Sequence, residues 1–373
     1  MFVQGNKLVS IIEEFAPPKF ALEWDSTGLQ WGDLRRDAPA VLMALDFSAE
    51  VLEEALEAGA SFVFTHHPYL FQPLKRIDLA NPRDNLIARA LAAGITLYCA
   101  HTNLDVAPGG VNDALAELLG LENTELLAPI GAEDLEKLVT FIPEGYEDRV
   151  RDALAEAGAG WIGNYSHCTY QLMGTGTFLP REGADPFLGA TGRLEKVAEY
   201  RLETILPKYR RKDIVEALLA AHPYEEVAYD LYPLSREGDS YGLGRIGELK
   251  AEVTLKELAE SCRDLLRPDY LKVHGDLMTK VRKAAVLGGS GGDYIGTALQ
   301  KGADVFITGD LKFHQAQEAA LYGLPLIDAG HDATEWPAIP ALADVLREKM
   351  QQNNYQTKIL VSKIRKKMWQ IIS

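Results

Sequence analysis

The chain has 373 residues, of which 47% are hydrophobic and 25% are charged. This length predicts two domains, and this composition is typical of a folded globular protein, which excludes disordered and collagen-like chains. The 54 acidic residues outnumber the 38 basic ones and leave a net charge of −16, which argues against a general nucleic-acid binder.

Cysteine usage and hydropathy indicate the compartment. Cys99, Cys168 and Cys262 lie far apart and form no Cys-x-x-Cys pair, so neither a disulfide framework nor a thiolate zinc site is expected. No apolar run approaches the roughly 18 residues that span a bilayer, and the first residues lack the pattern of a signal peptide. The sequence therefore predicts a cytoplasmic protein with no membrane partner.

Two stretches of the chain share one order of predicted elements. Apolar runs alternate with segments of helical spacing, which is typical of β-α-β-α-β units with parallel strands. The expected elements of the first stretch are 38–47, 48–60, 61–65, 85–94 and 95–100. Those of the second stretch are 283–289, 293–303, 304–308, 314–323 and 324–330.

The two stretches also share residues. ALEAGASFVFT, residues 55–65, aligns without a gap with ALQKGADVFIT, residues 298–308. A duplication or the general likeness of α/β elements would produce such a match. We favour a duplicated α/β core with largely parallel sheets, whose loops face a common crevice beyond the carboxyl ends of the strands, where α/β sheets bind ligands.

The middle of the chain follows a different plan. A β-α-β-β-α-β order, which is ferredoxin-like, is expected at 137–143, 147–159, 167–178, 192–206, 210–222 and 226–234. Loops rich in glycine and proline lie within it at 180–192 and at its exit at 235–244. The predicted domains are a discontinuous core, 1–133 and 237–373, and an inserted α+β domain, 134–236.

A histidine pair follows the strand expected at 61–65. Adjacent residues of a strand point to opposite faces, so His66 and His67 act together only where the strand has ended, and Pro68 favours that ending. Two neutral imidazoles at the edge of a sheet suit zinc, iron, manganese, cobalt or nickel. A purely structural pair is the alternative.

A second cluster, AHTNLD, follows the strand expected at 95–100. His101 offers a nitrogen and Asp105 a carboxylate oxygen to the same crevice. The alternative is an Asx turn with a hydrogen-bonded histidine, leading into two glycines.

A third cluster, GHDATE, lies at the matching edge of the second stretch. His331 and Glu335 are spaced i, i+4, which places them on one face of a helix, and Pro337 suits an early helical position. An ordinary capped helix start is the alternative. Three histidines and two carboxylates exceed the needs of one tetrahedral ion, whereas two ions that share a carboxylate would use them all.

Two further segments belong to the second stretch. GDLKFH keeps Asp310, Lys312 and His314, which are candidates for substrate binding or proton relay, although a structural role for His314 is equally open. The GGSGG loop, 288–292, either presents amides to a phosphate or only makes a tight turn.

The chain ends in a basic stretch without acids from residue 351 onward. It predicts either a contact with an anion or a solvated helix or frayed tail. Its basic residues are Lys358, Lys363, Arg365, Lys366 and Lys367.

Together these motifs resemble the Nif-three-like dinuclear-metal family, whose members go by the name GTP cyclohydrolase I type 2 homologues. EWDSTGLQWGD at 23–33, THHP, AHTNLD, GGSGG, GDLKFH and GHDATE occur in the order of that family. The resemblance implies a centre of two divalent metal ions, a PII/CutA-like inserted domain and a homo-oligomer, namely a ring-shaped hexamer. The metal ligands it implies are His66, His67, Asp105, His331 and Glu335. The ending SKIRKKMWQIIS departs from the short apolar end expected of the family.

The resemblance also implies an activity. A metal-dependent hydrolase would activate a water to attack carbon C8 of a GTP-like nucleotide and open the imidazole ring, with His101 or His314 as the catalytic proton carrier. A metal-dependent phosphoesterase and a non-enzymatic metal-handling or regulatory protein remain as alternatives.

Overall fold

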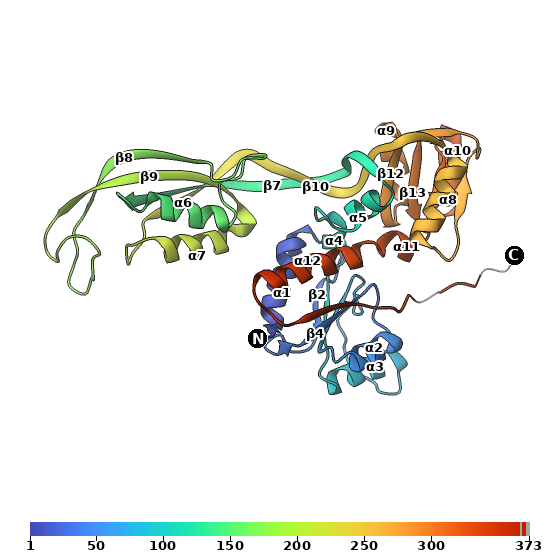
Figure 1. Ribbon diagram of the computed structural model, residues 1–373, viewed down its shortest axis with the longest axis horizontal. Coiled ribbons are helices and arrows are strands. Elements are labelled where there is room, and N and C mark those ends of the chain that lie inside the picture. Colours follow the sequence, from blue (N-terminus) through green and yellow to red (C-terminus); the bar gives the residue numbers. More distant parts are fainter. Residues whose placement is uncertain (366–367, 371–373) are drawn as a thin grey trace. The chain divides into compact units, whose positions relative to one another are not determined.

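The computed structural model describes residues 1–365 and 368–370, and the chain divides into two compact units (Figure 1). Residues 1–130 and 241–373 form one unit, named here the core unit. Residues 131–240 form the other, named here the middle unit. The core unit is therefore built from both ends of the chain.

The first sheet of the core unit has five strands in the order β15-β4-β5-β6-β2. Four of them are parallel, and β2 is an antiparallel edge strand on β6. The strands are β2 (Gly28–Trp31), β4 (Ala40–Ala44), β5 (Phe62–Thr65), β6 (Thr96–Cys99) and β15 (Lys358–Val361). Every residue of β4, β5 and β6 is buried, which explains their unbroken apolar character.

The second sheet of the core unit repeats this plan. Parallel strands β12, β13 and β14 lie at its centre, between antiparallel β11 and β10. The bounds are β10 (Tyr229–Thr254), β11 (Lys272–His274), β12 (Lys280–Ser290), β13 (Val305–Gly309) and β14 (Leu326–Asp328). The connecting helices of the two sheets are α2 (Ala49–Glu57), α3 (Pro82–Ala92), α9 (Ile295–Gln300) and α10 (Phe313–Tyr322). The predicted duplicated α/β core is confirmed, with antiparallel strands added at the edges.

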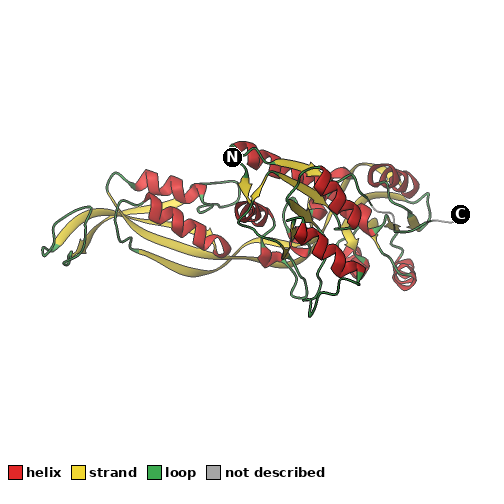
Figure 2. Ribbon diagram, turned by 90° about the horizontal axis from the view of Figure 1, so that it is seen from below, coloured by secondary structure: helices red, strands yellow, loops and turns green. Residues whose placement is uncertain are grey.

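Further helices and one short strand pair complete the core unit (Figure 2). The helices are α1 (Gly5–Phe15), α4 (Thr102–Val106), α5 (Val111–Leu118), α8 (Leu255–Leu266), α11 (His331–Glu335) and α12 (Ala338–Gln352). The 3₁₀ helices are η1 (Pro18–Phe20) and η3 (Gly292–Tyr294), and β1 (Val3–Gln4) pairs with β3 (Asp37–Ala38).

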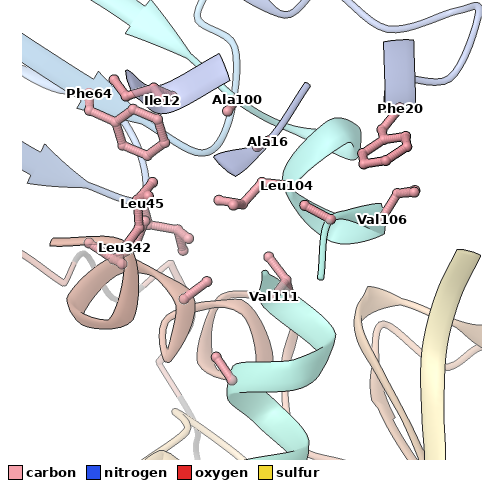
Figure 3. Packing of buried hydrophobic residues seen from close by; sticks show 14 of the residues in the cluster. Ile12, Ala16, Phe20, Leu45, Phe64, Ala100, Leu104, Val106, Val111 and Leu342 are labelled. Carbon is pink, nitrogen blue, oxygen red and sulfur yellow. The ribbon is translucent and has the colours of Figure 1, made fainter. Parts of the chain in front are cut away.

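One hydrophobic cluster joins the two halves of the core unit (Figure 3). It contains Phe64 of the first sheet and Phe306 of the second, together with Leu104 of α4 and Leu342 of α12. All four side chains are at most 1% exposed. Because interiors are close-packed and yield little, this cluster holds the strand ends of both halves at fixed positions.

The middle unit has the later part of β7 (Leu121–Pro143), α6 (Glu147–Glu156), β8 (Thr169–Phe178), β9 (Glu195–Pro207), η2 (Lys208–Arg210), α7 (Arg211–Ala221) and the first part of β10. Apart from the one-turn η2, their β-α-β-β-α-β order is the order expected from the sequence. The sheet runs β10-β7-β9-β8, and helices α6 and α7 bury their apolar sides in a separate hydrophobic cluster with strands β7 and β9.

Strands β7 and β10 are longer than expected, at 23 and 26 residues. The segment 235–244, expected to be an exit loop because of its glycines, continues as strand β10. A Cβ atom on Gly242 would lie 2.2 Å from the carbonyl oxygen of Ala128 on β7. Glycine therefore permits a close approach of two strands at this position and does not mark a turn.

Part of the basic end of the chain is a strand and not the expected solvated helix or frayed tail, whereas residues 362–365 and 368–370 have no regular secondary structure. Residues Lys358–Val361 form β15, and Ile359 is 6% exposed because it packs in the core unit. The guanidinium of Arg365 lies over the ring of Trp336, 5.0 Å from its centroid. Lys366 and Lys367 lie outside the described residues.

None of the helices within residues 1–365 and 368–370 is long and apolar enough to cross a membrane.

Joining Ala132 to Gly238 through a short flexible linker is expected to leave a folded core unit. The two ends lie close together, since a Cβ atom on Gly238 would be 2.9 Å from the Cβ atom of Glu133. The five candidate metal ligands lie outside the removed segment, so thermal unfolding and metal content of the shortened chain measure the effect. Loss of both folding and metal would contradict an insertion of residues 134–236 into the core.

Candidate metal centre

The histidine pair stands where a buried strand ends. Strand β5 ends at Thr65, and the backbone N–H groups of His66 and His67 both donate to the carbonyl oxygen of Leu45, at 3.1 and 3.0 Å. The chain turns at this point, so both imidazoles can point to the same side. His66 is fully buried.

The other candidate ligands lie on two short helices that follow strands β6 and β14. His101 precedes α4, which carries Asp105. His331 and Glu335 are the first and last residues of α11, which confirms the helix predicted from their spacing. Their Nε2 and Oε1 atoms lie 3.1 Å apart.

The carboxylate of Glu335 lies at the centre of these side chains. Its Oε1 is 3.7 Å from Nε2 of His66, and its Oε2 is 2.9 Å from Nε2 of His67. Oδ1 of Asp105 is 3.5 Å from the same Nε2 atom of His66. Five side chains from both halves of the core unit therefore converge on one small region.

These ligand atoms form overlapping groups, within each of which the atoms lie no more than 4.8 Å apart. One group is His67, His331 and Glu335, and another is His66, Asp105 and Glu335. Glu335 belongs to both groups, as a carboxylate that bridges two ions would. A third group joins His101 to His66 and His67, so His101 belongs to the same cluster.

Each imidazole of the cluster is held at its Nδ1 atom, which leaves Nε2 directed at the centre. The acceptors are Asp46 for His67, Asp25 for His101 and Asp310 for His331, each at 2.8 Å, and the Ala100 carbonyl for His66 at 3.0 Å. Carboxylates in this position orient metal-binding histidines and raise their basicity.

Reasoning from the sequence missed Asp25 and Asp46 and assigned Asp310 a different role. Asp46 comes two residues after the end of β4, so the rule that identified His66 and His101 would have found it too. Asp25 lies before the edge strand β2, in a segment with no periodic pattern, and only its place in EWDSTG distinguishes it.

The chemistry of the cluster fits a bound cation. Among the described residues, six buried side-chain polar atoms lack a hydrogen-bond partner. Four of them belong to candidate ligands: His66 Nε2, His67 Nε2, Asp105 Oδ1 and Glu335 Oε2. These four atoms face one another, as in the 2.9 Å approach of His67 Nε2 to Glu335 Oε2. Since a buried polar atom without a hydrogen bond is costly, a cation bound among them would satisfy all four.

The charges of the cluster lead to the same conclusion. Burial raises the pKa of Asp105 to about 7, and the charge of Glu335 adds to the rise. Burial opposes the charged forms of His67 and His331, yet Glu335 and the aspartates behind them raise their pKa values to about 11 and about 9. The two close carboxylates thus favour protonated imidazoles. Bound divalent ions can supply the same positive charge in place of those protons.

Three amides of the GGSGG loop do not face a phosphate as considered from the sequence. The N–H groups of Gly288, Gly289 and Gly291 donate to side-chain oxygens of Asn112, Thr334 and Thr308, at 3.0, 2.9 and 2.9 Å. These three donors are therefore occupied within the protein.

The loop instead makes room for Glu335. Gly289 has a φ of +72°, and a Cβ atom there would lie 2.3 Å from Oε1 of Glu335. Both the backbone conformation and the close approach require glycine.

His314 and Lys312 do not join the cluster. Both are exposed at the start of helix α10, and Nδ1 of His314 lies 3.4 Å from Oε1 of Gln317 on the same helix. Of the two predicted proton carriers, the structure brings only His101 to the candidate ligands.

Comparison with known proteins gives a consistent result over the whole chain. A model of the Duf34/NIF3 family (NGG1p interacting factor 3) matches residues 3–368. The chain is 47% identical over 331 residues to a Bacillus subtilis protein named GTP cyclohydrolase 1 type 2 homolog, and the aligned residues make up 89% of each of the two chains. It is 43% identical over 360 residues to a protein of the same name from Halalkalibacterium halodurans, which covers 96% of each.

A solved structure agrees with these matches. The crystal structure of a Bacillus cereus protein related to NIF3 superimposes with a TM-score of 0.89, at 44% identity and with all of both chains covered. With this fold and a family match from residue 3 to residue 368, the chain belongs to the Duf34/NIF3 family.

Proposed function

We propose that this protein is a dinuclear metal-dependent hydrolase that opens the imidazole ring of a GTP-like purine nucleotide. The observation that carries the proposal is the buried carboxylate of Glu335, which belongs to two ligand groups at once. The name GTP cyclohydrolase 1 type 2 homolog, given to its relatives, supports a purine nucleotide as the substrate.

The residues that would hold the ions follow from the two groups. His67 and His331 would hold one ion, His66 and Asp105 the other, and Glu335 would bridge them. Bound divalent ions supply Lewis-acid chemistry, because they lower the pKa of a water molecule towards about 7 and polarise the bond under attack. Zinc, iron, manganese, cobalt and nickel all suit these nitrogen and oxygen donors.

The position of His101 supports a role in proton transfer. Asp25 accepts a hydrogen bond from its Nδ1 atom, so Nε2 keeps a lone pair for a proton on the side of the cluster. Burial opposes the ionised form of Asp25, yet hydrogen bonds from His101 and Thr102 lower its pKa to about 2. Asp25 thus stays charged and can stabilise the imidazolium that forms.

Two exposed aromatic rings flank His101 and favour a substrate with a planar ring. Trp24 is 64% exposed and Phe71 is 54% exposed. Their ring centroids lie 5.9 and 6.1 Å from that of His101. A purine base can pack against such surfaces while the cluster faces its imidazole ring.

Metal-loaded protein is expected to release formate from GTP or a related purine nucleotide, because hydrolysis at C8 removes that carbon. Asp105→Asn is expected to lower kcat more than about 100-fold without unfolding the chain, since an amide keeps the shape of the carboxylate but not its charge. Formate and phosphate release, measured with manganese, zinc, iron and cobalt, decide between the reactions.

The products and two further variants separate the alternatives. Phosphate without formate would indicate a phosphoesterase. No product above that of Asp105→Asn with any of the four metals would contradict the hydrolase and leave a metal-binding protein. His101→Gln should lower turnover and His314→Gln should not, and the reverse result would assign the proton transfer to His314.

A further inference from the structure

The middle unit has a pocket of its own. Its volume is about 640 Å³, within the range of roughly 300–1,000 Å³ that is typical of sites for small molecules. Residues of strands β7, β8 and β9, of the loop that follows β8 and of the segment 224–228 line it. All of these residues lie in the middle unit, so the pocket does not depend on the metal centre.

Three aromatic rings form much of its wall. The ring centroid of Tyr224 lies 6.2 Å from those of both Phe178 and Phe187. Phe141 and Leu179 add further apolar surface. Phe187 is 45% exposed although it belongs to this aromatic group, so its ring remains available to a ligand.

A carboxylate lies buried in this apolar wall. Glu199 of strand β9 is only 7% exposed, and the hydroxyl of Tyr224 donates to its Oε1 at 2.9 Å. Within the part of the chain that the structure describes, no Lys, Arg or His side chain forms an ion pair with it. Because a buried carboxylate with only a neutral donor is costly, a cationic ligand would stabilise this arrangement.

The backbone of strand β8 leaves space for that carboxylate. A Cβ atom on Gly176 would lie 1.8 Å from Oε2 of Glu199, so no larger residue at 176 is compatible with this position of the carboxylate. The second oxygen of Glu199 thus occupies a space that only glycine leaves open.

The remaining charges of the lining are mostly negative. Glu225 and Glu226 line the pocket together with Arg181, so with Glu199 three acids face one base. Oε1 of Glu225 accepts a hydrogen bond from the backbone N–H of Asp185 at 2.9 Å, which ties the loop after β8 to the segment 224–228. The lining therefore attracts a cation and repels an anion.

We propose that this pocket binds a small primary amine with an aromatic or aliphatic body. The ammonium group lies against Glu199, and the body packs against Phe178, Phe187 and Tyr224. This assignment is independent of the function proposed for the metal centre.

The test uses matched pairs of probes on the full chain by isothermal titration calorimetry. The pairs are phenethylamine with phenylpropionate, tryptamine with indolepropionate, and hexylamine with heptanoate. At least one amine is expected to bind at least about tenfold more tightly than its carboxylate partner, the scale of one charge-assisted hydrogen bond. If every amine fails to bind, or binds no better than its partner, the proposal is overturned.

Three variants locate the effect. Glu199→Gln removes the charge, and Gly176→Ala displaces the carboxylate but keeps its charge, so both are expected to abolish the preference for amines. Glu203→Gln removes the same charge from the same strand outside the pocket and should keep the preference. An equal loss in Glu203→Gln, or an undiminished preference in folded Glu199→Gln, would overturn the assignment; circular dichroism checks folding.

Discussion

Replacing Glu335 by glutamine is expected to lower the number of divalent ions bound per chain from two to none. Glu335 belongs to both ligand groups, and its side chain is buried against three imidazoles, so losing its charge leaves each of the two groups with two ligands. Asp105→Asn changes only one of those groups and is expected to leave one ion. Elemental analysis of metal-loaded, desalted protein measures both counts.

The exposed Glu318 of helix α10 provides the control, because Glu318→Gln removes the same charge and should leave both ions bound. A bound metal ion also stabilises the folded protein, by about 2.7 kcal/mol at a free metal concentration 100 times the Kd. A chelator should therefore lower the Tm of the unchanged protein and leave that of Glu335→Gln unaltered. Zero or one ion in the fully loaded unchanged protein would contradict the dinuclear centre.

The meeting of distant residues at this centre could be predicted because strands have simple rules. Parallel strands end at the same edge of a sheet, so side chains that follow β5 and β6 are expected near one edge. Strand β14 ends at the matching edge of the second sheet, which the duplicated plan turns towards the same crevice. His331 and Glu335 are spaced i, i+4, so a helix at this segment brings their side chains together. Both arguments depend on backbone periodicity, which is visible in the sequence.

The partners of the imidazoles follow no such rule. Asp25 and Asp46 are two of 54 acidic residues, and each is placed by the packing of a loop and not by a repeating pattern.

The same limit applies to glycine. In the loop at 288–292 and in β10, glycine was expected to serve a phosphate or a turn, whereas in both it permits a close approach by another part of the chain. Such approaches depend on tertiary structure.

Gly289→Ala is expected to lower the ion count below one per chain, although residue 289 is not a candidate ligand. A Cβ atom at this position would lie 2.3 Å from Oε1 of Glu335, so the carboxylate proposed to bridge the two ions must move away from His331 and His66. The φ of +72° adds strain of about 1–2 kcal/mol for alanine, which lowers stability as well. Elemental analysis and the Tm measure the two effects separately.

Gly323→Ala separates the two causes, because it carries the backbone strain without the collision. Gly323 ends helix α10 with a φ of +70°, and a Cβ atom there would meet no other atom within 4 Å. Gly323→Ala should therefore lose only the stability that the backbone strain costs and keep both ions, whereas Gly289→Ala should lose metal and at least as much stability. If Gly289→Ala kept both ions while folded, Glu335 could not be the bridging ligand in its present position; if Gly323→Ala also lost them, general destabilisation would explain the effect.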